Sequence, residues 1–209
     1  MEKPIINYES LVRITRYLSS LRDPEEIVLV AVEGVSNALK VKGCTLFLFD
    51  RKEKELSLAG SYGLSQEYLE KGPVSALKSI ASSLEDGQPV AIYDVNDDPR
   101  IQYPEAARKE GIASILAVPM IFGERTIGSL RVYTTDTWEF GLNDVNFVQA
   151  VAQVVGMALE MCRINKGYKE SIEILKSMRD PRTIKFSKRT PYEGVPKSFT
   201  NEEVASATG

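Results

Sequence analysis

The sequence contains no histidine at all. This absence excludes Ser-His-Asp and Cys-His catalysis, histidine-ligated metals, axial-histidine haem and a phospho-accepting histidine. There are only two cysteines, Cys44 and Cys162, in segments of different type, so neither a disulfide framework nor a cysteine-only metal site is expected. Free cysteine is usually a small buried hydrophobe, which leaves redox sensing by these two residues a minor alternative. We expect no metal and no cofactor.

The chain also lacks a strong charge of one sign and long apolar runs. Its net charge of −3 argues against a general nucleic-acid binder, which would usually be basic. No apolar run reaches the roughly 18–20 residues that span a bilayer, and the start MEKPIINYESL lacks the order of a signal peptide. We therefore expect a cytoplasmic protein with no nucleic-acid or membrane partner. A length of 209 residues allows one core-forming domain with extensions, or at most two small domains.

The clearest pattern lies in the second half of the chain, where two runs and a helix follow one another. Residues 113–121 are apolar, and the reversal after them contains Gly123, which can take the positive φ of a hairpin loop. Residues 126–134 alternate as a half-buried strand does. Residues 143–159 repeat apolar side chains at helical spacing, and helical character persists to about Met178. A hairpin followed by a helix across one face is typical of an α+β domain.

The remaining elements are predicted from the same periodicities. Helices are expected at 5–21, 25–40, 65–71, 74–85 and 104–110, and strands at 44–50, 56–62 and 89–93. Asp23 is the expected N-cap of the second helix, with Pro24 in its first turn. Alternation in the second strand puts Leu56, Leu58 and Tyr62 on one face.

Four segments resemble a known family when they are taken in order. They are GCTLFLFD at 43–50, DGQPVAIYDVNDDPR at 86–100, SILAVPM at 114–120 with GERTIGSLRVY at 123–133, and FGLNDVNFVQAVAQVVGMALE at 140–160. Together they resemble the GAF domain, a sensory module of signalling proteins, over about Tyr8 to Arg163. The resemblance implies an α+β fold with a central antiparallel sheet of about five to six strands. The N- and C-terminal helices would pack on one face, and a ligand pocket would lie on the other under short helices and a loop.

This fold implies a division of the chain into four parts. Residues 1–21 form an N-terminal helix and a dimerisation candidate, residues 22–163 the GAF domain, and residues 164–178 an extension of the C-terminal helix. Residues 179–209 contain prolines and basic residues without apolar periodicity, and we expect a flexible or docking tail there.

Strand alternation assigns side chains to the two faces of the sheet. The expected pocket face carries Thr45, Phe47, Phe49, Ser129, Arg131 and Tyr133, and the helix face carries Cys44, Leu46, Leu48, Leu130 and Val132. Arg131 is the sharpest candidate, because a cation among aromatic side chains would bind a carboxylate or phosphate through its bidentate fork. The alternative is that Arg131 pairs with an acid such as Asp94 or reaches solvent.

Further ligand-binding candidates come from the tyrosines, the serines and the polar loop at 94–103, because small-molecule sites combine aromatic walls with a few polar groups. They are Tyr62, Ser79, Ser83, Tyr93, Asp94, Arg100, Tyr103 and Ser114. Each type has a structural alternative: tyrosines that pack at the core edge, serines on an exposed helix face, and an Asp-rich loop that is a solvated turn. The acidic spacing of this loop does not fit an EF-hand.

The functional branches of the family can be compared with this sequence. Cyclic-nucleotide-binding members carry an Asn-Lys pair, a Phe and an Asp-Glu pair. Phe140 and Asp144 resemble the Phe and Asp, but Thr134 and Thr135 stand at the Asn-Lys pair and Val145 at the Glu, so nucleotide binding is not expected. The free methionine sulfoxide reductase works through several pocket cysteines, and bilin- and haem-binding members need a pocket cysteine or a histidine. This chain lacks these residues.

The sequence therefore predicts a non-catalytic, stand-alone or subunit-type sensor that binds a small metabolite, with an anion favoured by Arg131, and signals through its terminal helices to a protein partner. We expect a homodimer through apolar residues of these helices. They are Leu11, Leu18, Ile164, Ile172 and Leu175. One alternative is a protein-interaction scaffold whose vestigial pocket is filled by Phe47, Phe49 and Tyr133. A GAF-derived enzyme such as the sulfoxide reductase is the third hypothesis.

Overall fold

The computed structural model describes residues 8–50, 55–75 and 87–178. The chain divides into two compact units, residues 1–164 and residues 165–209. The first unit contains the sheet, and the described part of the second is the helical segment 165–178. The tail 179–209 and most of the helix predicted at 74–85 lie outside the described residues.

The first unit is built on one six-stranded sheet. Its strands are β1 (Gly43–Asp50), β2 (Glu55–Tyr62), β3 (Val74–Ser75), β4 (Val90–Ile92), β5 (Ser114–Phe122) and β6 (Arg125–Thr134). Their order is β3-β2-β1-β6-β5-β4, and every neighbouring pair is antiparallel. The predicted α+β class with a central antiparallel sheet is confirmed.

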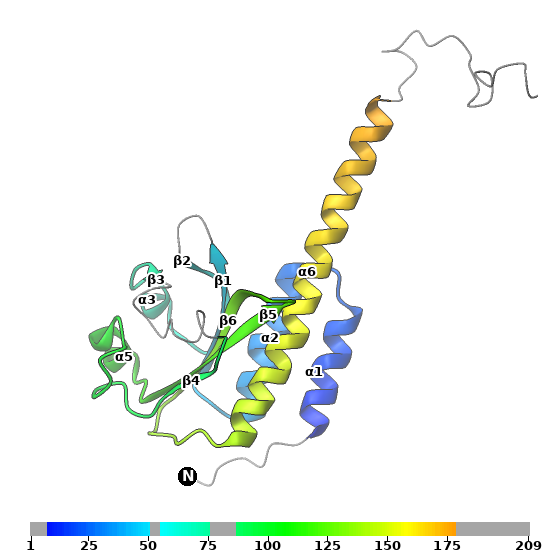
Figure 1. Cartoon of the computed structure of the whole chain (residues 1–209). Helices are drawn as coiled ribbons and strands as arrows, with labels where there is room; N and C mark the ends of the chain where they lie inside the picture. The colour runs from blue at the N-terminus through cyan, green and yellow to red at the C-terminus, as the bar shows by residue number, and fades with distance from the viewer. Residues whose placement is uncertain (1–7, 51–54, 76–86, 179–209) are drawn as a thin grey trace, which may run out of the picture. The chain divides into compact units, whose positions relative to one another are not determined.

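The helices cover both faces of this sheet. They are α1 (Tyr8–Ser20), α2 (Pro24–Leu39), α3 (Gln66–Leu69), α5 (Pro104–Glu110) and α6 (Leu142–Met178). In Figure 1, α1, α2 and the first part of α6 lie on one side of the sheet, and α3 and α5 lie on the other. Local signals behave as predicted: the Asp23 carboxylate accepts a hydrogen bond from the Glu25 N–H at 2.8 Å, and Gly123 takes a φ of 61° in the β5–β6 turn.

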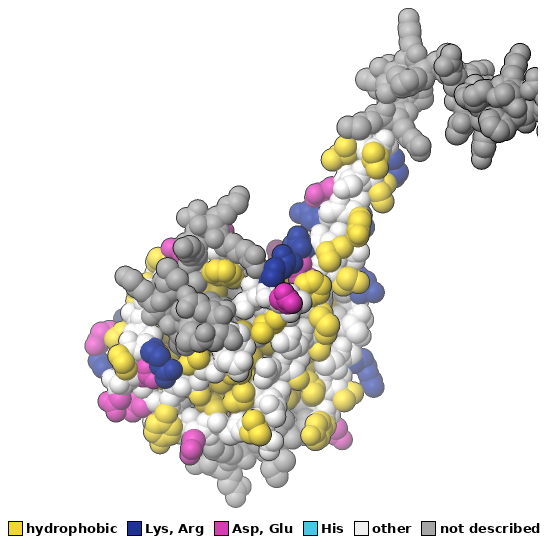
Figure 2. Space-filling view, viewed as in Figure 1, with side chains coloured by type: hydrophobic (Ala, Val, Ile, Leu, Met, Phe, Trp, Pro, Cys, Tyr) yellow, Lys and Arg dark blue, Asp and Glu magenta, His cyan; other side chains and the backbone are white. Residues whose placement is uncertain are grey.

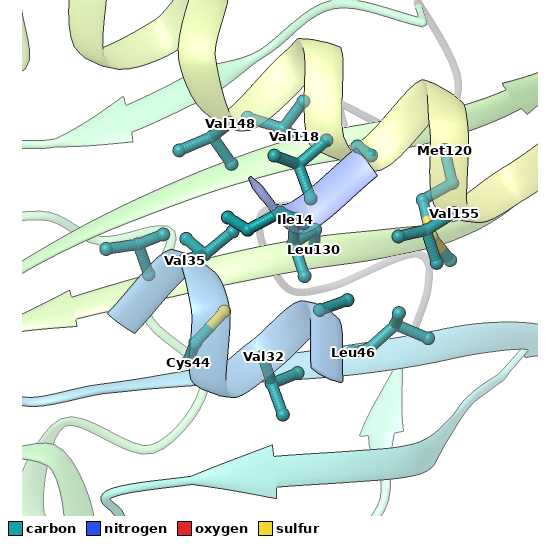
Figure 3. Packing of buried hydrophobic residues seen from close by; sticks show 14 of the residues in the cluster. Ile14, Val32, Val35, Cys44, Leu46, Val118, Met120, Leu130, Val148 and Val155 are labelled. Atoms are coloured by element: carbon teal, nitrogen blue, oxygen red, sulfur yellow. The ribbon is translucent and has the colours of Figure 1, made fainter. Parts of the chain in front are cut away.

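The main core lies between the sheet and the long helices (Figure 3). Cys44, Leu46, Leu130 and Val132 are all fully buried in it, which confirms the predicted helix face at these four positions. Leu48, which was assigned to the same face, is 37% exposed and lies outside this core. Leu18 of α1 is 1% exposed in the same cluster. Leu18 therefore covers the core of its own chain and is not available for the dimer contact that the sequence predicted for it.

A β-bulge in the pairing of β1 with β2 changes which face some side chains take. Tyr62 pairs with Cys44, but the register shifts after Leu46, and Leu58 pairs with Phe47. Residues directly opposite one another share a face of the sheet. Tyr62 therefore lies on the helix face with Cys44, whereas Leu58 lies on the other face with Phe47. The prediction that Leu58 and Tyr62 share a face is wrong, because one extra residue on β2 reverses the alternation.

The segment after Gly72-Pro73 also differs from its prediction. Val74 and Ser75 were expected to begin a helix, but they form β3 and pair with Leu56 and Glu55 of β2. Val74 is 7% exposed and clusters with Leu56. Burial of this β-branched side chain against the sheet outweighs the helical periodicity that the sequence suggested.

Helix α6 is the one helix within the described residues that is long and apolar enough to cross a membrane by length and composition, with a mean hydropathy of 1.4 over its most apolar 18 residues. The helix contains no uninterrupted apolar run of roughly 18–20 residues, because Asn146, Gln149 and Gln153 interrupt its apolar part. The core helix of a globular domain also meets the criterion of length and composition, and 39% of this window is buried inside the protein. Val148, Val151 and Val155 of α6 belong to the main core.

Candidate functional site

A small cavity lies on the face of the sheet opposite the long helices. It is lined by Tyr68, Lys71, Val74, Ile101, Gln102, Tyr103, Ile115, Arg131 and Tyr133. These side chains come from α3, the segment between α3 and β3, the strands β3, β5 and β6, and the loop before α5. The volume of about 30 Å³ leaves room for roughly two water molecules. Any ligand that fits without rearrangement must be compact.

Arg131 forms part of the floor of this cavity. Its neighbours across the sheet are Thr45 on β1 and Ala117 on β5, and its side chain is 5% exposed. The guanidinium carbon lies 4.9 Å from the centre of the Phe47 ring, in a cation–π arrangement. Burial lowers the pKa of Arg131, while the neighbouring Tyr133 acts in the opposite direction. A guanidinium keeps its charge even so, because its ordinary pKa lies so far above neutrality.

Two buried tyrosines stand beside Arg131. The Tyr133 hydroxyl lies 3.0 Å from the Thr45 hydroxyl, and the Tyr133 ring meets the Tyr68 ring edge-on with centres 5.8 Å apart. Burial raises the pKa of both tyrosines. Their hydroxyls therefore stay neutral near physiological pH and can both donate and accept hydrogen bonds.

Lys71 brings a second positive charge to the cavity. Its Nζ donates to the Tyr68 carbonyl oxygen at 3.0 Å and lies 3.7 Å from the centre of the Tyr68 ring. Burial and, to a lesser degree, the charge of Arg131 lower the pKa of Lys71 from 10.5 to about 8, and Glu110 opposes this. The two ionised side chains among the described lining residues are thus both cations.

Hydrogen bonds beside the cavity join the segment between α3 and β3 to the loop before α5, which lies about 30 residues further along the chain. The Pro73 carbonyl accepts hydrogen bonds from the Tyr103 hydroxyl at 2.8 Å and from the Gln102 amide at 3.1 Å. Gly72 has a φ of 124°, and a Cβ at this position would lie 2.9 Å from the Tyr103 hydroxyl. Only glycine suits both the backbone conformation and this close approach.

The structure brings five of the predicted ligand-binding residues together. Thr45, Phe47, Arg131 and Tyr133 lie in direct contact on β1 and β6, and Tyr103 joins Arg131 and Tyr133 on the cavity wall. Ser79 and Ser83 lie outside the described residues. Whether any of these side chains contacts a ligand stays a prediction.

Ser114, Asp94 and Tyr93 take part in local structure instead of the cavity wall. The Ser114 hydroxyl donates to the Tyr93 carbonyl and accepts a hydrogen bond from the Trp138 N–H at 2.8 Å. The Asp94 carboxylate accepts from the backbone N–H and the side-chain amide of Asn96, both at 2.9 Å. The Tyr93 side chain is 59% exposed. These contacts join the loop after β4 to the start of β5.

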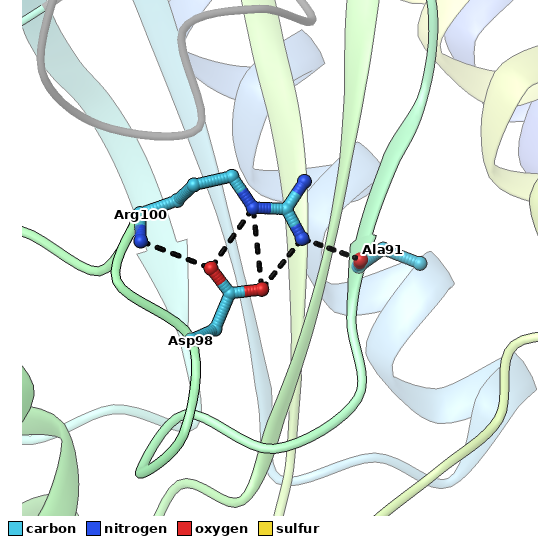
Figure 4. A network of polar contacts seen from close by, with 3 residues as sticks. All are labelled: Ala91, Asp98 and Arg100. Atoms are coloured by element: carbon cyan, nitrogen blue, oxygen red, sulfur yellow. Dashed lines mark hydrogen bonds and ion pairs between the residues drawn. The ribbon is translucent and has the colours of Figure 1, made fainter.

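Arg100 lies on the outside of the same loop, and Tyr62 lies on the other face of the sheet. The Arg100 guanidinium donates to the Asp98 carboxylate, with Nη2 at 2.5 Å, and reaches the Ala91 carbonyl oxygen at 3.5 Å (Figure 4). These bonds from Arg100 lower the pKa of Asp98. Neither Arg100 nor Tyr62 is among the described residues that line the cavity.

Sequence reasoning missed several lining residues, among them Lys71, Tyr68 and Gln102. They lie on short segments where no periodicity assigns a face. The one available signal was the Gly72-Pro73 break, which forces the chain to turn and thereby directs the residues on either side of it toward the sheet.

The two cysteines lie away from the cavity. Cys44 is fully buried on the helix face, and this burial raises the pKa of its thiol. The Cys162 thiol donates to the Arg22 carbonyl oxygen at 3.3 Å, next to α1. Within the described ranges there is also no group of three or more His, Cys, Asp or Glu side chains that could bind a metal ion.

Asp144 and Phe140 form part of the start of α6. The Asp144 carboxylate accepts hydrogen bonds from the Gly141 N–H at 2.8 Å and from the Trp138 indole N–H at 3.2 Å, and the Trp138 ring stacks on Phe140 at 5.7 Å. A carboxylate in the first turn that reaches back to the residue before the helix stabilises the N-terminus. These two residues therefore have a structural role in this chain.

Comparison with solved structures shows the same fold in several proteins. The chain is similar to the GAF domain of a phosphoenolpyruvate-protein phosphotransferase from Coxiella burnetii, with 20% identity, a TM-score of 0.69, and coverage of 77% of this chain and 96% of that one. It is similar to the free methionine-R-sulfoxide reductase from Neisseria meningitidis, solved in complex with its substrate, with 19% identity, a TM-score of 0.66, and coverage of 76% and 90%. A GAF domain/HD domain protein from Geobacter sulfurreducens has 20% identity, a TM-score of 0.60, and coverage of 70% and 98%.

Comparison of the sequence with curated proteins finds no match. The sequence of residues 23–159 matches the GAF domain family. This match covers more than half of the chain, and the neighbouring structures share the observed fold. The resemblance noted in the sequence is thus confirmed, and the chain belongs to the GAF domain family, whose members are sensory and regulatory modules of signalling proteins.

Proposed function

We propose that this protein is a non-catalytic regulatory sensor that binds a small molecule with an acidic group on the pocket face of its sheet. The observation that carries the proposal is the position of Arg131, whose buried guanidinium lines a cavity together with Tyr133 and Tyr68. A carboxylate or phosphate group is the natural partner of a guanidinium, because the planar fork donates two parallel hydrogen bonds to it. Placing such a ligand beside a buried cation also offsets the cost of removing that cation from water.

The experiment is ligand screening by thermal unfolding, with Arg131→Ala as the test variant. The matched control is Arg125→Ala, because Arg125 lies on the same strand but is exposed. Native mass spectrometry of the purified protein would first identify any acid that copurifies with it. We expect an acidic ligand to stabilise the wild-type chain and the control but not Arg131→Ala. Equal stabilisation of all three proteins would contradict the proposed role of Arg131.

A protein-interaction scaffold is the second candidate, and the small size of the cavity favours it. Ligand pockets usually enclose about 300–1,000 Å³, whereas this cavity measures about 30 Å³. Three residues were expected to fill a vestigial pocket. Phe47 and Tyr133 are buried on the pocket face, and Phe49 is partly buried against the Phe47 cluster. A protein that binds no small molecule in the screen but retains a stable fold would support the scaffold.

Catalysis like that of the sulfoxide reductase is the weakest candidate. The thiol of Cys44 lies on the opposite face of the sheet from the cavity, and Cys162 contacts Arg22 beside α1. A thiol reductase needs accessible, ionisable cysteines at the substrate. We therefore propose that the chain has no reductase activity, and turnover of free methionine sulfoxide would contradict this.

We propose further that the end of α6 joins two copies of the chain in a parallel coiled coil. Counting Met161 as position a of a heptad, every charged residue up to Lys176 falls at position b, c or f. These residues are Arg163, Lys166, Lys169, Glu170, Glu173 and Lys176. Positions a, d, e and g carry no charge, and they include Tyr168 and Leu175, which are 66% and 61% exposed. Figure 2 shows hydrophobic side chains along α6 between the charged ones.

Light scattering after gel filtration tests this dimer. Leu175→Glu introduces a charge at position a and is expected to give monomers, whereas Lys169→Glu at position b is a control expected to leave the dimer intact. A wild-type monomer at micromolar concentration would contradict the proposal. A change in dimer stability on ligand binding would support transmission of a signal through the terminal helices, and a signalling protein is the expected partner. This role is consistent with a cytoplasmic location.

A further inference from the structure

The second cation of the cavity, Lys71, lies on a segment that crosses from α3 to β3. We call residues 71–74 the strap. At one end Lys71 contacts the ring and the carbonyl oxygen of Tyr68, and at the other end Val74 pairs with Leu56 in the sheet. Because β3 is an edge strand and has only two residues, the strap is joined to the sheet by few hydrogen bonds.

The middle of the strap is fastened by side chains rather than by the backbone of the sheet. The Pro73 carbonyl accepts hydrogen bonds from Tyr103 and Gln102, which themselves line the cavity. The Gln102 amide also donates to the Tyr103 hydroxyl at 3.1 Å. These polar contacts connect the strap to the loop before α5 directly beside the space where a ligand would lie.

Arg131 approaches the same cavity from a rigid element. Strand β6 is paired on both sides, with β1 and with β5, and Arg131 is opposite Thr45 and Ala117. The cavity thus has one cation on the floor, fixed by the sheet, and one on the strap. Both side chains line the same cavity of about 30 Å³, and Tyr68 lies between them in the lining, with Lys71 over its ring at 3.7 Å and the Tyr133 ring beside it at 5.8 Å.

We propose that Lys71 and Arg131 bind one compact oxyanion from two sides. The bound anion would then connect the strap to strand β6, where Arg131 forms part of the floor of the cavity. This inference rests on the proposed sensor function and adds the second contact and the size of the ligand's anionic part. Two like charges in one small cavity repel each other. An anion bound between them attracts both cations, and these two attractions offset the repulsion. The recognised chemistry is a carboxylate or phosphate group with few other atoms, since the cavity has a volume of about 30 Å³.

The same chemistry has two sources, a free small anion or the acidic end of a larger metabolite. The test uses the full chain with formate, acetate and inorganic phosphate as probes, then the straight-chain carboxylates up to hexanoate, all at constant ionic strength. A free anion as ligand predicts that the smallest probes bind best, with a rise in Tm of about 5–10 °C at saturation near 100 times Kd. Tighter binding of hexanoate than of acetate would show instead that the acid group is the end of a larger ligand.

Affinity is then measured by calorimetry in Lys71→Met, Arg131→Met and the double variant. Lys109→Met and Arg125→Met are controls, because both replaced residues are exposed. If one anion touches both cations, each single variant loses affinity at least about tenfold, and the double variant loses little more than the worse single variant, since the two changes remove a shared interaction. Circular dichroism checks the fold, and Arg131→Lys, which keeps the charge but loses the fork, replaces Arg131→Met if the latter does not fold.

Two outcomes would overturn the inference, and they can be told apart. Anion binding that survives within about twofold in Lys71→Met but is lost in Arg131→Met would leave the proposed sensor intact and remove Lys71 from the site. No binding of any probe to the wild-type chain would refute both the two-cation site and the acidic-ligand sensor.

Discussion

The lysine of the strap leads to a quantitative prediction about stability and pH. In the folded protein, burial first and the charge of Arg131 second lower the pKa of Lys71 from 10.5 to about 8, against the opposing effect of Glu110. Tyr68 and Tyr133 also face this part of the cavity, and burial raises their pKa values, so they stay neutral over most of the range. Between pH 8 and 10.5 the unfolded chain therefore holds a proton on Lys71 that the folded chain has released.

This difference in proton binding sets the sign of the effect. The free energy of unfolding rises with pH wherever the unfolded state binds more protons. The penalty for burying a charged Lys71 is thus fully present below about pH 8 and disappears as the pH approaches 10.5. At about 1.4 kcal/mol per pH unit the full change would be about 3 kcal/mol, and because the side chain is only half-buried, solvent screening reduces this to about 1–2 kcal/mol.

The assay is urea unfolding at several pH values from 7 to 10, for the wild-type chain and Lys71→Met. All other titrating groups are common to both proteins, so the difference between their free energies of unfolding isolates Lys71. We expect the wild type to gain about 1–2 kcal/mol relative to Lys71→Met across this range. The exposed control Lys109→Met should show no such gain. Parallel curves for the wild type and Lys71→Met would refute the argument that the amine is desolvated in the cavity.

Three further substitutions test the fold around the site by chemical unfolding. Leu130→Ala, which removes a fully buried side chain from the main core, should lower the free energy of unfolding by about 2–5 kcal/mol, and a loss below 1 kcal/mol would contradict its place there. Asp144→Ala removes the acceptor at the start of α6, so we expect a loss of about 1–2 kcal/mol and a shifted emission of Trp138, the single tryptophan; unchanged emission would argue against their hydrogen bond. Gly72→Ala places a methyl group against the Tyr103 hydroxyl at a positive φ, which should cost at least about 1 kcal/mol; an unchanged midpoint would show that the strap adapts.

Much of this architecture could be predicted because β1 and β6 follow simple physical rules. Apolar side chains occupy alternate positions at Cys44 and Leu46 and at Leu130 and Val132, so these faces were expected to meet the helices. Alternation then placed Thr45 and Arg131 together on the other face. Arg131 and Tyr133 were found in the cavity by the same argument. Tyr103 was also predicted, from the aromatic and polar composition of its loop, but Tyr68, Lys71 and Gln102 could not be, because no periodic pattern covers their segments.

Two local features, the bulge in β2 and the path of the strap, could not be predicted from the sequence patterns. The bulge that turns Tyr62 to the helix face is one extra residue in β2, and nothing in the alternation before or after it reveals the insertion. The strap owes its path to Gly72 and to contacts with Tyr103, which lies about 30 residues away. Propensity and periodicity are local quantities, so neither reports a contact that depends on the folded sheet.

The pairing of β1 with β6 at the centre of the sheet has a consequence for how the protein is made. Thr45 and Tyr133, whose hydroxyls meet beside the cavity, are 88 residues apart in the chain. Contacts between such distant segments require a long loop to close before they contribute, which slows folding. During synthesis, which proceeds from the N-terminus, the helices α1 and α2 and the strand β1 leave the ribosome well before β6 and α6. The main core contains residues of α6 and β6 as well as of α2 and β1. We infer that it cannot be completed until β6 and the apolar part of α6 have emerged.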